Sequence, residues 1–309
     1  METITRIKDN IKKVIIGKDT QIDLVLTALL ASGHVLIEDT PGTGKTKLAK
    51  ALVASIDGTF QRIQFTPDLL PSDVTGIHMF HQKKQEFEFI PGPVFTNILL
   101  ADEINRATPR TQSCLLEAMA EGQVTIDGKT KQLNRPFFLI ATENPIEAAG
   151  TFPLPEAQLD RFDLKIAMGF PSQEEQLQLL NRFLADDPEQ TLTPVCTLSD
   201  ILDLQKQVKN IYFHEDVKNY IITLVQATHF QEQILLGINP RGLLSLTHLS
   251  QAYALIKGRD YVTPDDIKVL LKPCFAHRLI TTSGINRDEI ANAALDQILQ
   301  NTPVPTEQF

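Results

Sequence analysis

The segment His34-Val-Leu-Ile-Glu-Asp-Thr-Pro-Gly-Thr-Gly-Lys-Thr46 decides the fold class of this chain. It predicts a buried strand from Val35 that runs into a glycine-rich loop, followed by a helix that begins at Lys45. Glycines let backbone N–H groups approach phosphates, and the amino end of a helix adds positive potential. Lys45 can reach the β- and γ-phosphates of a nucleotide, and the Thr46 hydroxyl can ligate Mg²⁺. The segment therefore predicts a nucleoside triphosphate site, although Asp39 places a carboxylate where the loop pattern asks for glycine.

Length and composition set limits on the class of protein. The chain has 309 residues, enough for two domains, and a formal net charge of -9 at pH 7. An acidic balance argues against broad adhesion to nucleic acid or to an anionic membrane. Three widely spaced cysteines without metal-ligand spacing predict reduced thiols in a cytoplasmic protein. No apolar run of about 20 residues occurs, so we expect no membrane insertion.

Apolar runs and helical periodicity alternate over the first part of the chain. Strands are expected at 61–65, 97–101, 137–141 and 162–168, with a helix from Thr108 that stops at Gly122. Strands separated by helices predict a parallel sheet that is covered on both faces. Beyond Pro171 the pattern is helical only. We expect an α/β nucleotide-binding domain over residues 1–180 and a small all-helical domain over residues 181–309.

Polar side chains follow two of the expected strands. Asp102 can hold Mg²⁺ or its water shell, and Glu103 can orient and deprotonate the attacking water. Asn144 ends the next strand, where its amide can position water against the γ-phosphate. Each feature alone has a structural explanation, a solvated strand end or an Asn-Pro turn. Their spacing downstream of Lys45 favours catalysis.

Two arginines are candidates for contact with the γ-phosphate. Arg161 lies in a sharp segment before a strand, and a cation in such a place can act in a neighbouring subunit's site. The alternative is a surface arginine paired with Asp160 or Asp163. Arg241 opens a helix in the carboxyl-terminal region, from which it could fold onto a bound nucleotide.

Together these residues resemble the MoxR family of AAA+ ATPases over almost the whole chain. The most specific segments are Leu99-Leu-Ala-Asp-Glu-Ile-Asn-Arg-Ala107, Ala141-Thr-Glu-Asn-Pro-Ile146, Thr151-Phe-Pro-Leu-Pro-Glu-Ala-Gln-Leu-Asp-Arg-Phe162 and Gly258-Arg-Asp-Tyr-Val-Thr-Pro-Asp-Asp-Ile267. The resemblance implies an AAA+ P-loop core followed by a helical lid. It implies these site residues: a Walker A loop with Asp39, Thr40, Pro41, Gly42, Thr43, Gly44, Lys45 and Thr46, Walker B at Asp102 and Glu103, sensor one at Asn144, an arginine finger at Arg161 and sensor two at Arg241.

The resemblance also implies an assembly and a role. It implies a ring, usually a hexamer, that holds ATP or ADP between subunits, with Ile16 and Gly17 near the adenine. MoxR relatives are chaperone-like and typically act with von Willebrand factor A domain proteins. We therefore expect Mg²⁺-dependent ATP hydrolysis that remodels or matures partner proteins. A chelatase-type subunit that drives metal insertion is the alternative. A nucleic-acid motor is disfavoured, since Lys129 and Lys131 are too few for a tracking groove.

Two inserts and one departure complete the comparison with the family. Residues 65–93 resemble a helix-two insert, and residues 123–133, around Asp127-Gly128, predict a hairpin that resembles the pre-sensor-one insert. The first insert carries Met79, Phe80, Phe87 and Phe89, which either face the ring axis or a partner, or pack as one face of a hairpin. Glu143 stands where the family often has Gln, and its charge beside the water site is expected to slow turnover.

Overall fold

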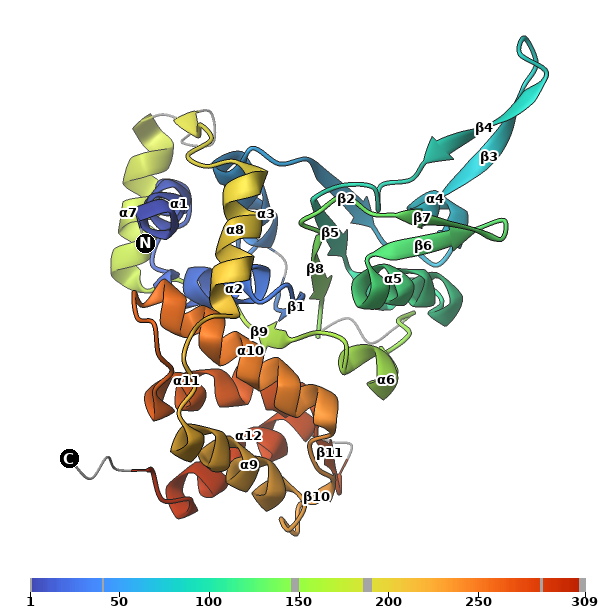
Figure 1. Ribbon diagram of the computed structural model, residues 1–309. Helices are drawn as coiled ribbons and strands as arrows, with labels where there is room; N and C mark the ends of the chain where they lie inside the picture. Colours follow the sequence, from blue (N-terminus) through green and yellow to red (C-terminus); the bar gives the residue numbers. More distant parts are fainter. Residues whose placement is uncertain (1, 41, 146–149, 186–190, 284–285, 306–309) are drawn as a thin grey trace.

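The computed structural model describes residues 2–40, 42–145, 150–185, 191–283 and 286–305 (Figure 1). Its centre is a five-stranded sheet in the order β2-β5-β8-β1-β9. The strands are β2 (Phe60–Gln64), β5 (Ile98–Asp102), β8 (Phe138–Glu143), β1 (Val35–Glu38) and β9 (Leu164–Ile166). Every neighbouring pair is parallel, so the carboxyl ends of all five strands share one edge. The predicted parallel sheet is confirmed.

Helices cover both faces of the sheet, because alternate residues of each buried strand point to opposite sides. Val35 and Ile37 of β1 face a core with α1 (Glu2–Lys12), α2 (Asp19–Leu30) and α3 (Lys45–Ile56). Leu36 faces the second core, which includes α5 (Pro109–Glu121). Helix α5 begins after Thr108 with Pro109 at its first position and ends at Gly122, whose φ is 62°, as the sequence predicts.

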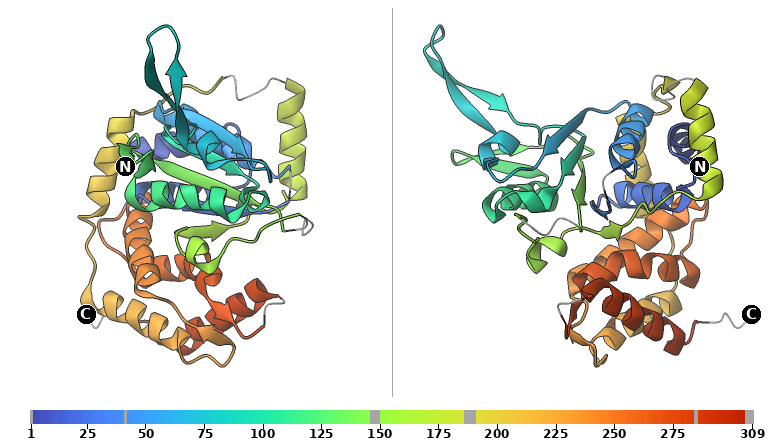
Figure 2. Two further views of the ribbon diagram at one scale, coloured as in Figure 1. Left: turned by 90° about the vertical axis from the view of Figure 1, so that its right-hand side faces the viewer. Right: turned by 180° about the vertical axis from the view of Figure 1, so that it is seen from behind.

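Two hairpins extend from the second face. The hairpin of β6 (Gln123–Ile126) and β7 (Lys129–Gln132) turns at Asp127 and Gly128, whose φ values of 49° and 74° are those of the predicted two-residue turn. The insert contains α4 (Pro71–Thr75) and the pair β3 (Gly76–His81) and β4 (Glu86–Pro91). The β3–β4 hairpin projects away from the rest of the molecule in all three views (Figure 1, Figure 2).

The carboxyl-terminal part is helical and lies against one end of the sheet domain (Figure 2). Beyond β9 the chain contains α7 (Gln173–Ala185), α8 (Leu198–Val208), α9 (Glu215–Thr228), α10 (Pro240–Ile256), α11 (Pro264–Phe275), the short helix η3 (Ala276–Arg278) and α12 (Arg287–Asn301). The short helices η1 (Ile104–Arg106) and α6 (Glu156–Leu159) belong to the sheet domain. One continuous apolar cluster joins residues of α10 and α11 to residues of α2 and β9. The helical domain is therefore docked on the core.

The helical domain also contains a ribbon that the sequence does not predict. Strands β10 (Ile234–Leu236) and β11 (Ile280–Thr281) pair in antiparallel fashion. Each is too short to show an alternating pattern, and Leu235 and Leu236 are exposed. Without periodicity, only the tertiary contact between distant segments identifies them as strands.

Candidate nucleotide-binding site

A pocket of about 370 Å³ lies where β1, β5 and β8 end. Its lining contains seven residues that the sequence assigns to nucleotide chemistry, together with Lys47, Arg62 and Gln64. The seven are Gly42, Gly44, Lys45, Thr46, Asp102, Glu103 and Asn144. Parallel strands place their carboxyl ends at one edge, which is where open α/β sheets bind ligands. The fold thus brings the expected phosphate, metal and water-positioning groups into one cavity.

The glycine loop offers its backbone to this pocket. Gly42 and Gly44 have φ values of 86° and 92°, and a Cβ added to either would meet no atom within 4 Å. Left-handed backbone at both positions favours glycine, and the open space beside them leaves room for a ligand against the main chain. Gly44 is the residue before helix α3, whose amino end supplies positive potential. Pro41 lies outside the described residues.

Lys45 is held inside the loop. Its Nζ donates to the carbonyl oxygen of Asp39 at 2.8 Å. Burial lowers the pKa of Lys45, while the carboxylates of Asp102, Asp39 and Glu103 oppose that effect. A desolvated ammonium near three carboxylates is poised to take an anionic partner. The residue is therefore placed as a phosphate ligand requires.

The carboxylate of Asp39, which stands where the loop pattern asks for glycine, accepts two backbone hydrogen bonds. Asp39 is buried, and its Oδ1 accepts from the backbone N–H of Thr40 at 2.7 Å. Its Oδ2 accepts from the backbone N–H of Gly169, also at 2.7 Å, just after β9. Carboxylates that accept backbone N–H bonds are well satisfied. Asp39 thus ties the start of the loop to the edge strand.

Strands β8 and β2 hold the two acidic residues at the end of β5. The Thr142 hydroxyl donates to Asp102 Oδ1 at 2.6 Å and accepts from the backbone N–H of Glu103 at 2.9 Å. Arg62 contacts Asp102 Oδ2 through Nε at 3.0 Å and Nη2 at 2.6 Å. Gln64 Nε2 donates to Glu103 Oε2 at 2.8 Å. Glu103 itself has a φ of 55°, so the chain turns sharply there and aims its side chain at the pocket edge.

Arg62, Gln64 and Thr142 are site residues that the sequence analysis does not identify. Arg62 and Gln64 are two residues apart on β2 and therefore point to one side of the strand. The register pairs Gln64 with Asp102, which brings that side to the acidic residues. Two polar residues at alternate positions of a short strand are the sequence signal from which Arg62 and Gln64 could have been predicted. Thr142 is hidden in an apolar run and gives no comparable signal.

We expect Thr142→Val to lower the rate of ATP hydrolysis by about 10- to 100-fold, as loss of a supporting hydrogen bond does at metal sites. Valine keeps the shape of threonine but removes the hydroxyl that joins Asp102 to the Glu103 backbone. Steady-state phosphate release and nucleotide titration on one preparation measure the effect. Thr142→Ser keeps the hydroxyl and is the control, so equal losses in both variants would contradict the assignment.

The remaining predicted residues lie in different surroundings. Asn144 is buried in the pocket lining. Arg161 follows α6 and is not among the lining residues; its Nη1 donates to the carbonyl oxygen of Leu116 at 2.6 Å. Its buried Nε has no hydrogen-bond partner among the described residues. Ile16 is buried beside Gly17, whose φ is 69° and whose Cα is covered by the Glu175 side chain.

Arg241 is engaged at the junction between the helical domain and the core. Its Nη1 contacts Asp160 Oδ2 at 3.2 Å, and the amide of Asn239 contacts the same oxygen at 3.0 Å. The buried Arg278 reaches Asp160 Oδ1 at 3.1 Å. Three side chains of the helical domain thus converge on the residue before Arg161. In this arrangement Arg241 is absent from the pocket lining.

The donor set fits ATP with Mg²⁺. An open cradle of left-handed glycines and the half-buried Lys45 suit a triphosphate. The Thr46 hydroxyl and the Asp102 carboxylate are oxygen ligands of the kind that Mg²⁺ prefers, with phosphate oxygens and water completing its octahedron. Among the described residues no cluster of three or more His, Cys, Asp or Glu side chains could hold a metal by itself.

Comparison with known proteins assigns the class. Residues 34–164 match the model of the ATPase family associated with various cellular activities (AAA), and residues 226–299 match the AAA lid domain. The crystal structure of a candidate ATPase from Cytophaga hutchinsonii superposes with a TM-score of 0.91 at 36% identity, covering 99% of this chain and 96% of that one. The fold is therefore an AAA+ core followed by a lid domain.

Sequence relatives narrow the class to one family. The Mycobacterium tuberculosis chaperone MoxR1 is 38% identical over 99% of this chain and 83% of its own length. The Paracoccus denitrificans protein MoxR is 29% identical over 94% of this chain and 93% of its own. The uncharacterized Bacillus subtilis protein YeaC is 49% identical over 97% of this chain and 94% of its own length. The chain belongs to the MoxR family of AAA+ ATPases.

Proposed function

We propose that this chain hydrolyses ATP to ADP and phosphate and uses the energy to remodel or mature other proteins. The observation that carries the proposal is the convergence of Lys45, Thr46, Asp102, Glu103 and Asn144 on one pocket. Similarity to a relative named a chaperone supports the remodelling role. The relatives with MoxR names do not favour the chelatase or nucleic-acid alternatives.

The proposed reaction divides the work among these side chains. Lys45 and the loop N–H groups bind the β- and γ-phosphates, and Thr46 with Asp102 would hold Mg²⁺, which neutralises developing charge when bound. Glu103 accepts a proton from the attacking water, and Asn144 orients that water by hydrogen bonding. The hydrogen bond from Gln64 Nε2, 2.8 Å long, holds the Glu103 carboxylate in position at the edge of the pocket. Positioning and electrostatics account for most of the catalysis in such sites.

We propose a ring, for which a hexamer is the expected form, with Arg161 completing the neighbouring subunit's site. Two features support this. Arg161 is not in the lining of its own pocket, and its Nε is buried without a partner among the described residues. A guanidinium that is only partly satisfied has hydrogen-bonding capacity left for a phosphate.

Partners and location are proposals of the same kind. We propose a von Willebrand factor A domain protein as partner, and a cytoplasmic location, which the free thiols of Cys114, Cys196 and Cys274 support. In the part of the chain that the structure describes, no helix has both the length and the apolarity needed to span a bilayer.

The proposed function is tested by trapping the ATP-bound form. Glu103→Gln protein in ATP is used as bait for cell extract, beside Lys45→Ala protein as a control that cannot load nucleotide. Recovery of a von Willebrand factor A protein with the first bait but not the second supports the proposal. Recovery of a chelatase subunit or of DNA supports an alternative, and wild-type protein without phosphate release contradicts the enzyme assignment.

The exposed aromatic pair on the β3–β4 hairpin provides a separate prediction. Phe80 and Phe87 are 52% and 71% exposed, and their rings meet edge to face at 5.4 Å. Large exposed apolar groups on a projecting element commonly mark an interaction site. We expect Phe80→Ala combined with Phe87→Ala to keep basal ATPase activity and the melting temperature but to weaken partner or client binding.

Phe89, on β4 of the same hairpin, is the matched control. Its ring packs on Phe95 at 5.5 Å, and Lys131 lies 4.1 Å above it. Phe89→Ala should lower the melting temperature by about 2–4 °C for each kcal/mol of lost packing. Thermal melts and phosphate-release rates on the same preparations separate the two roles. A large drop in melting temperature for the double variant would show that Phe80 and Phe87 are structural instead.

A further inference from the structure

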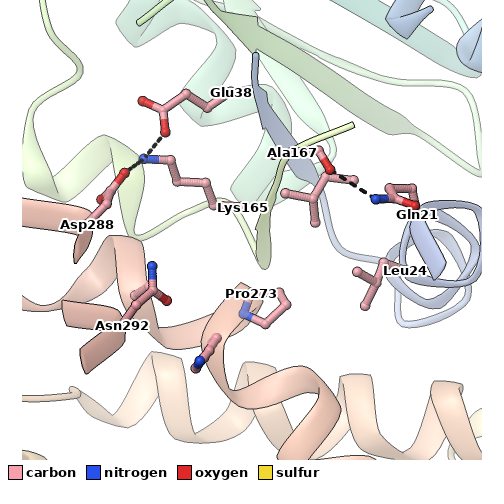
Figure 3. Close-up of a pocket in the computed structure, with 11 residues that line it drawn as sticks. Gln21, Leu24, Glu38, Lys165, Ala167, Pro273, Asp288 and Asn292 are labelled. Atoms are coloured by element: carbon pink, nitrogen blue, oxygen red, sulfur yellow. Dashed lines mark hydrogen bonds and ion pairs between the residues drawn. The ribbon is translucent and has the colours of Figure 1, made fainter. Parts of the chain in front are cut away.

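Three charged side chains join the lid to the sheet. The Lys165 ammonium from β9 lies 2.8 Å from Glu38 Oε2 at the end of β1 and 2.7 Å from Asp288 Oδ2 in the first turn of α12 (Figure 3). The Lys165 side chain is 16% exposed, against 29% for Glu38 and 44% for Asp288. A largely buried lysine therefore holds the lid helix α12 to the strand that leads into the phosphate loop.

A third carboxylate, that of Glu143, lies beside this group. Glu143 ends β8, and the register places it directly opposite Glu38 on β1. Burial raises the pKa of Glu143 to about 7; Lys165 opposes this, and the charges of Glu38 and Asp288 add to it. Like charges opposite one another on adjacent strands are unfavourable. Burial and the neighbouring carboxylates therefore favour the protonated form of Glu143.

The ammonium remains charged in these surroundings. Burial lowers the pKa of Lys165, but the carboxylates of Glu38 and Asp288 outweigh it, so that the net change is upward. Strand β5 lies on the other side of β8, and there Arg62 is paired with the Asp102 carboxylate, which also accepts from Thr142. Arg62 is therefore engaged elsewhere and does not pair with Glu143. Among the described neighbours, Lys165 is therefore the cation available to stabilise an ionised Glu143.

The position of the cluster links the lid to the catalytic loops. Glu38 precedes Asp39, which starts the phosphate loop, and Glu143 precedes Asn144 in the nucleotide pocket. A cavity of about 280 Å³ borders Lys165 and is also lined by Pro273 and Asn292 of the lid (Figure 3). The Lys165 side chain is therefore not packed tightly against the lid.

We propose that Lys165 is a positioning residue that couples the lid to the nucleotide site by exchanging partners. With the lid docked, Lys165 holds Asp288 and Glu38. When α12 moves away, Asp288 leaves and the ammonium turns to Glu143, which gives up its proton to solvent. The charges around the ends of β1 and β8 then change together. The phosphate loop and Asn144, which follow these strand ends, are affected by the same change. The effect on turnover rests on the ATPase activity proposed above.

The direction of the pH effect follows from this exchange. Glu143 has a raised pKa of about 7 in the docked form and a lower one once Lys165 pairs with it. Glu143 therefore takes up a proton when the lid docks. The docked form is favoured below pH 7, and its population falls as the pH rises through 7. One linked proton changes the ratio of docked to released forms by at most about tenfold per pH unit.

Lid position can be measured without relying on catalysis. Spin labels at Arg110→Cys on α5 and Gln300→Cys on α12, with Cys114→Ser to remove the half-buried thiol, report the distance between core and lid. We expect the docked population to fall between pH 6 and pH 8 in the full chain. Glu143→Gln should have the same docked population at both pH values, Lys165→Met should have a smaller docked population at both, and Lys165→Arg should restore docking.

A second ion pair of α12 provides the matched control. Lys272 contacts Asp296 at 2.6 Å within the lid, so Lys272→Met removes a lysine from the same region without touching the core. It should leave the distance distribution unchanged. A lid distance that is independent of pH in the wild type, or equal release by Lys272→Met and Lys165→Met, would overturn the partner exchange.

The catalytic consequence is measured on the same proteins. Lys165→Met should lower kcat by about tenfold, with the nucleotide Kd changed less than about threefold, within the range of ordinary coupling between sites. Glu143→Gln should flatten the pH profile of kcat between pH 6 and 8. Unchanged kcat with a released lid would overturn the positioning role. If the wild type hydrolysed no ATP, the proposed function would be wrong. The lid distances would still show whether Lys165 exchanges partners.

Discussion

Replacing Glu103 with Gln is expected to leave ATP binding intact and to slow hydrolysis by about 10²- to 10⁴-fold, the contribution of a general base. The reason is geometric. Glu103 sits at the edge of the pocket and is held by Gln64 and by Arg106, whose Nε lies 2.8 Å from the same Oε2. Glutamine keeps a carbonyl oxygen in that place and loses the ability to accept a proton from water. Isothermal titration beside a phosphate-release assay measures both quantities.

Lys45→Ala is the contrasting variant for this experiment. The Lys45 ammonium is partly desolvated and faces the pocket, so its removal should take away nucleotide affinity rather than rate alone. The division of labour predicts two distinct results, tight binding without turnover for Glu103→Gln and weak binding for Lys45→Ala. Equal loss of binding in both would show that Glu103 supports the phosphate loop and does not act on water.

The parts of the fold that could be predicted from sequence are those with local causes. Apolar runs of strand length predict strands at 97–101 and 137–141, and the observed strands Ile98–Asp102 and Phe138–Glu143 lie at these places, each extended into the polar residues that follow. The Asp127-Gly128 turn and the stop at Gly122 follow from backbone conformations that few residue types adopt. The domain boundary near residue 180 stays a prediction, since α7 (Gln173–Ala185) runs across it.

The parts that could not be predicted depend on contacts between distant segments. Asp39 looks like a misplaced charge in the loop, yet its partner is the backbone of Gly169, 130 positions later. Glu143 likewise looks like an added charge beside the water site, whereas its neighbours are Glu38 and Lys165 on two other strands. Arg241 is paired with Asp160, across the junction to the lid. Register and domain docking decide such pairs, and neither has a local signal.

Arg161→Ala is expected to retain nucleotide binding and to lose hydrolysis by about 10³- to 10⁵-fold, as removal of a finger arginine does in other nucleotide hydrolases. Arg161 is absent from the lining of its own pocket and is held by the carbonyl oxygen of Leu116. If it acts in a neighbouring subunit's site, activity per subunit must fall on dilution, when subunits separate. Turnover that does not depend on protein concentration in a monomeric sample would contradict this.

Mixing two inactive variants distinguishes action between subunits from damage to the fold. Arg161→Ala subunits keep Glu103, and Glu103→Gln subunits keep Arg161, so a site between unlike subunits can contain both groups in one of the two possible orders. Exchange of subunits should then restore part of the activity, whereas two folding defects would not complement each other. Arg110→Ala is the matched control, since Arg110 is an exposed arginine of the nearby helix α5 and should have little effect. Asp160, the residue before Arg161, is held by Arg241 and Arg278 of the lid, so an Arg161 that completes the neighbouring site is joined to the lid of its own subunit through Asp160.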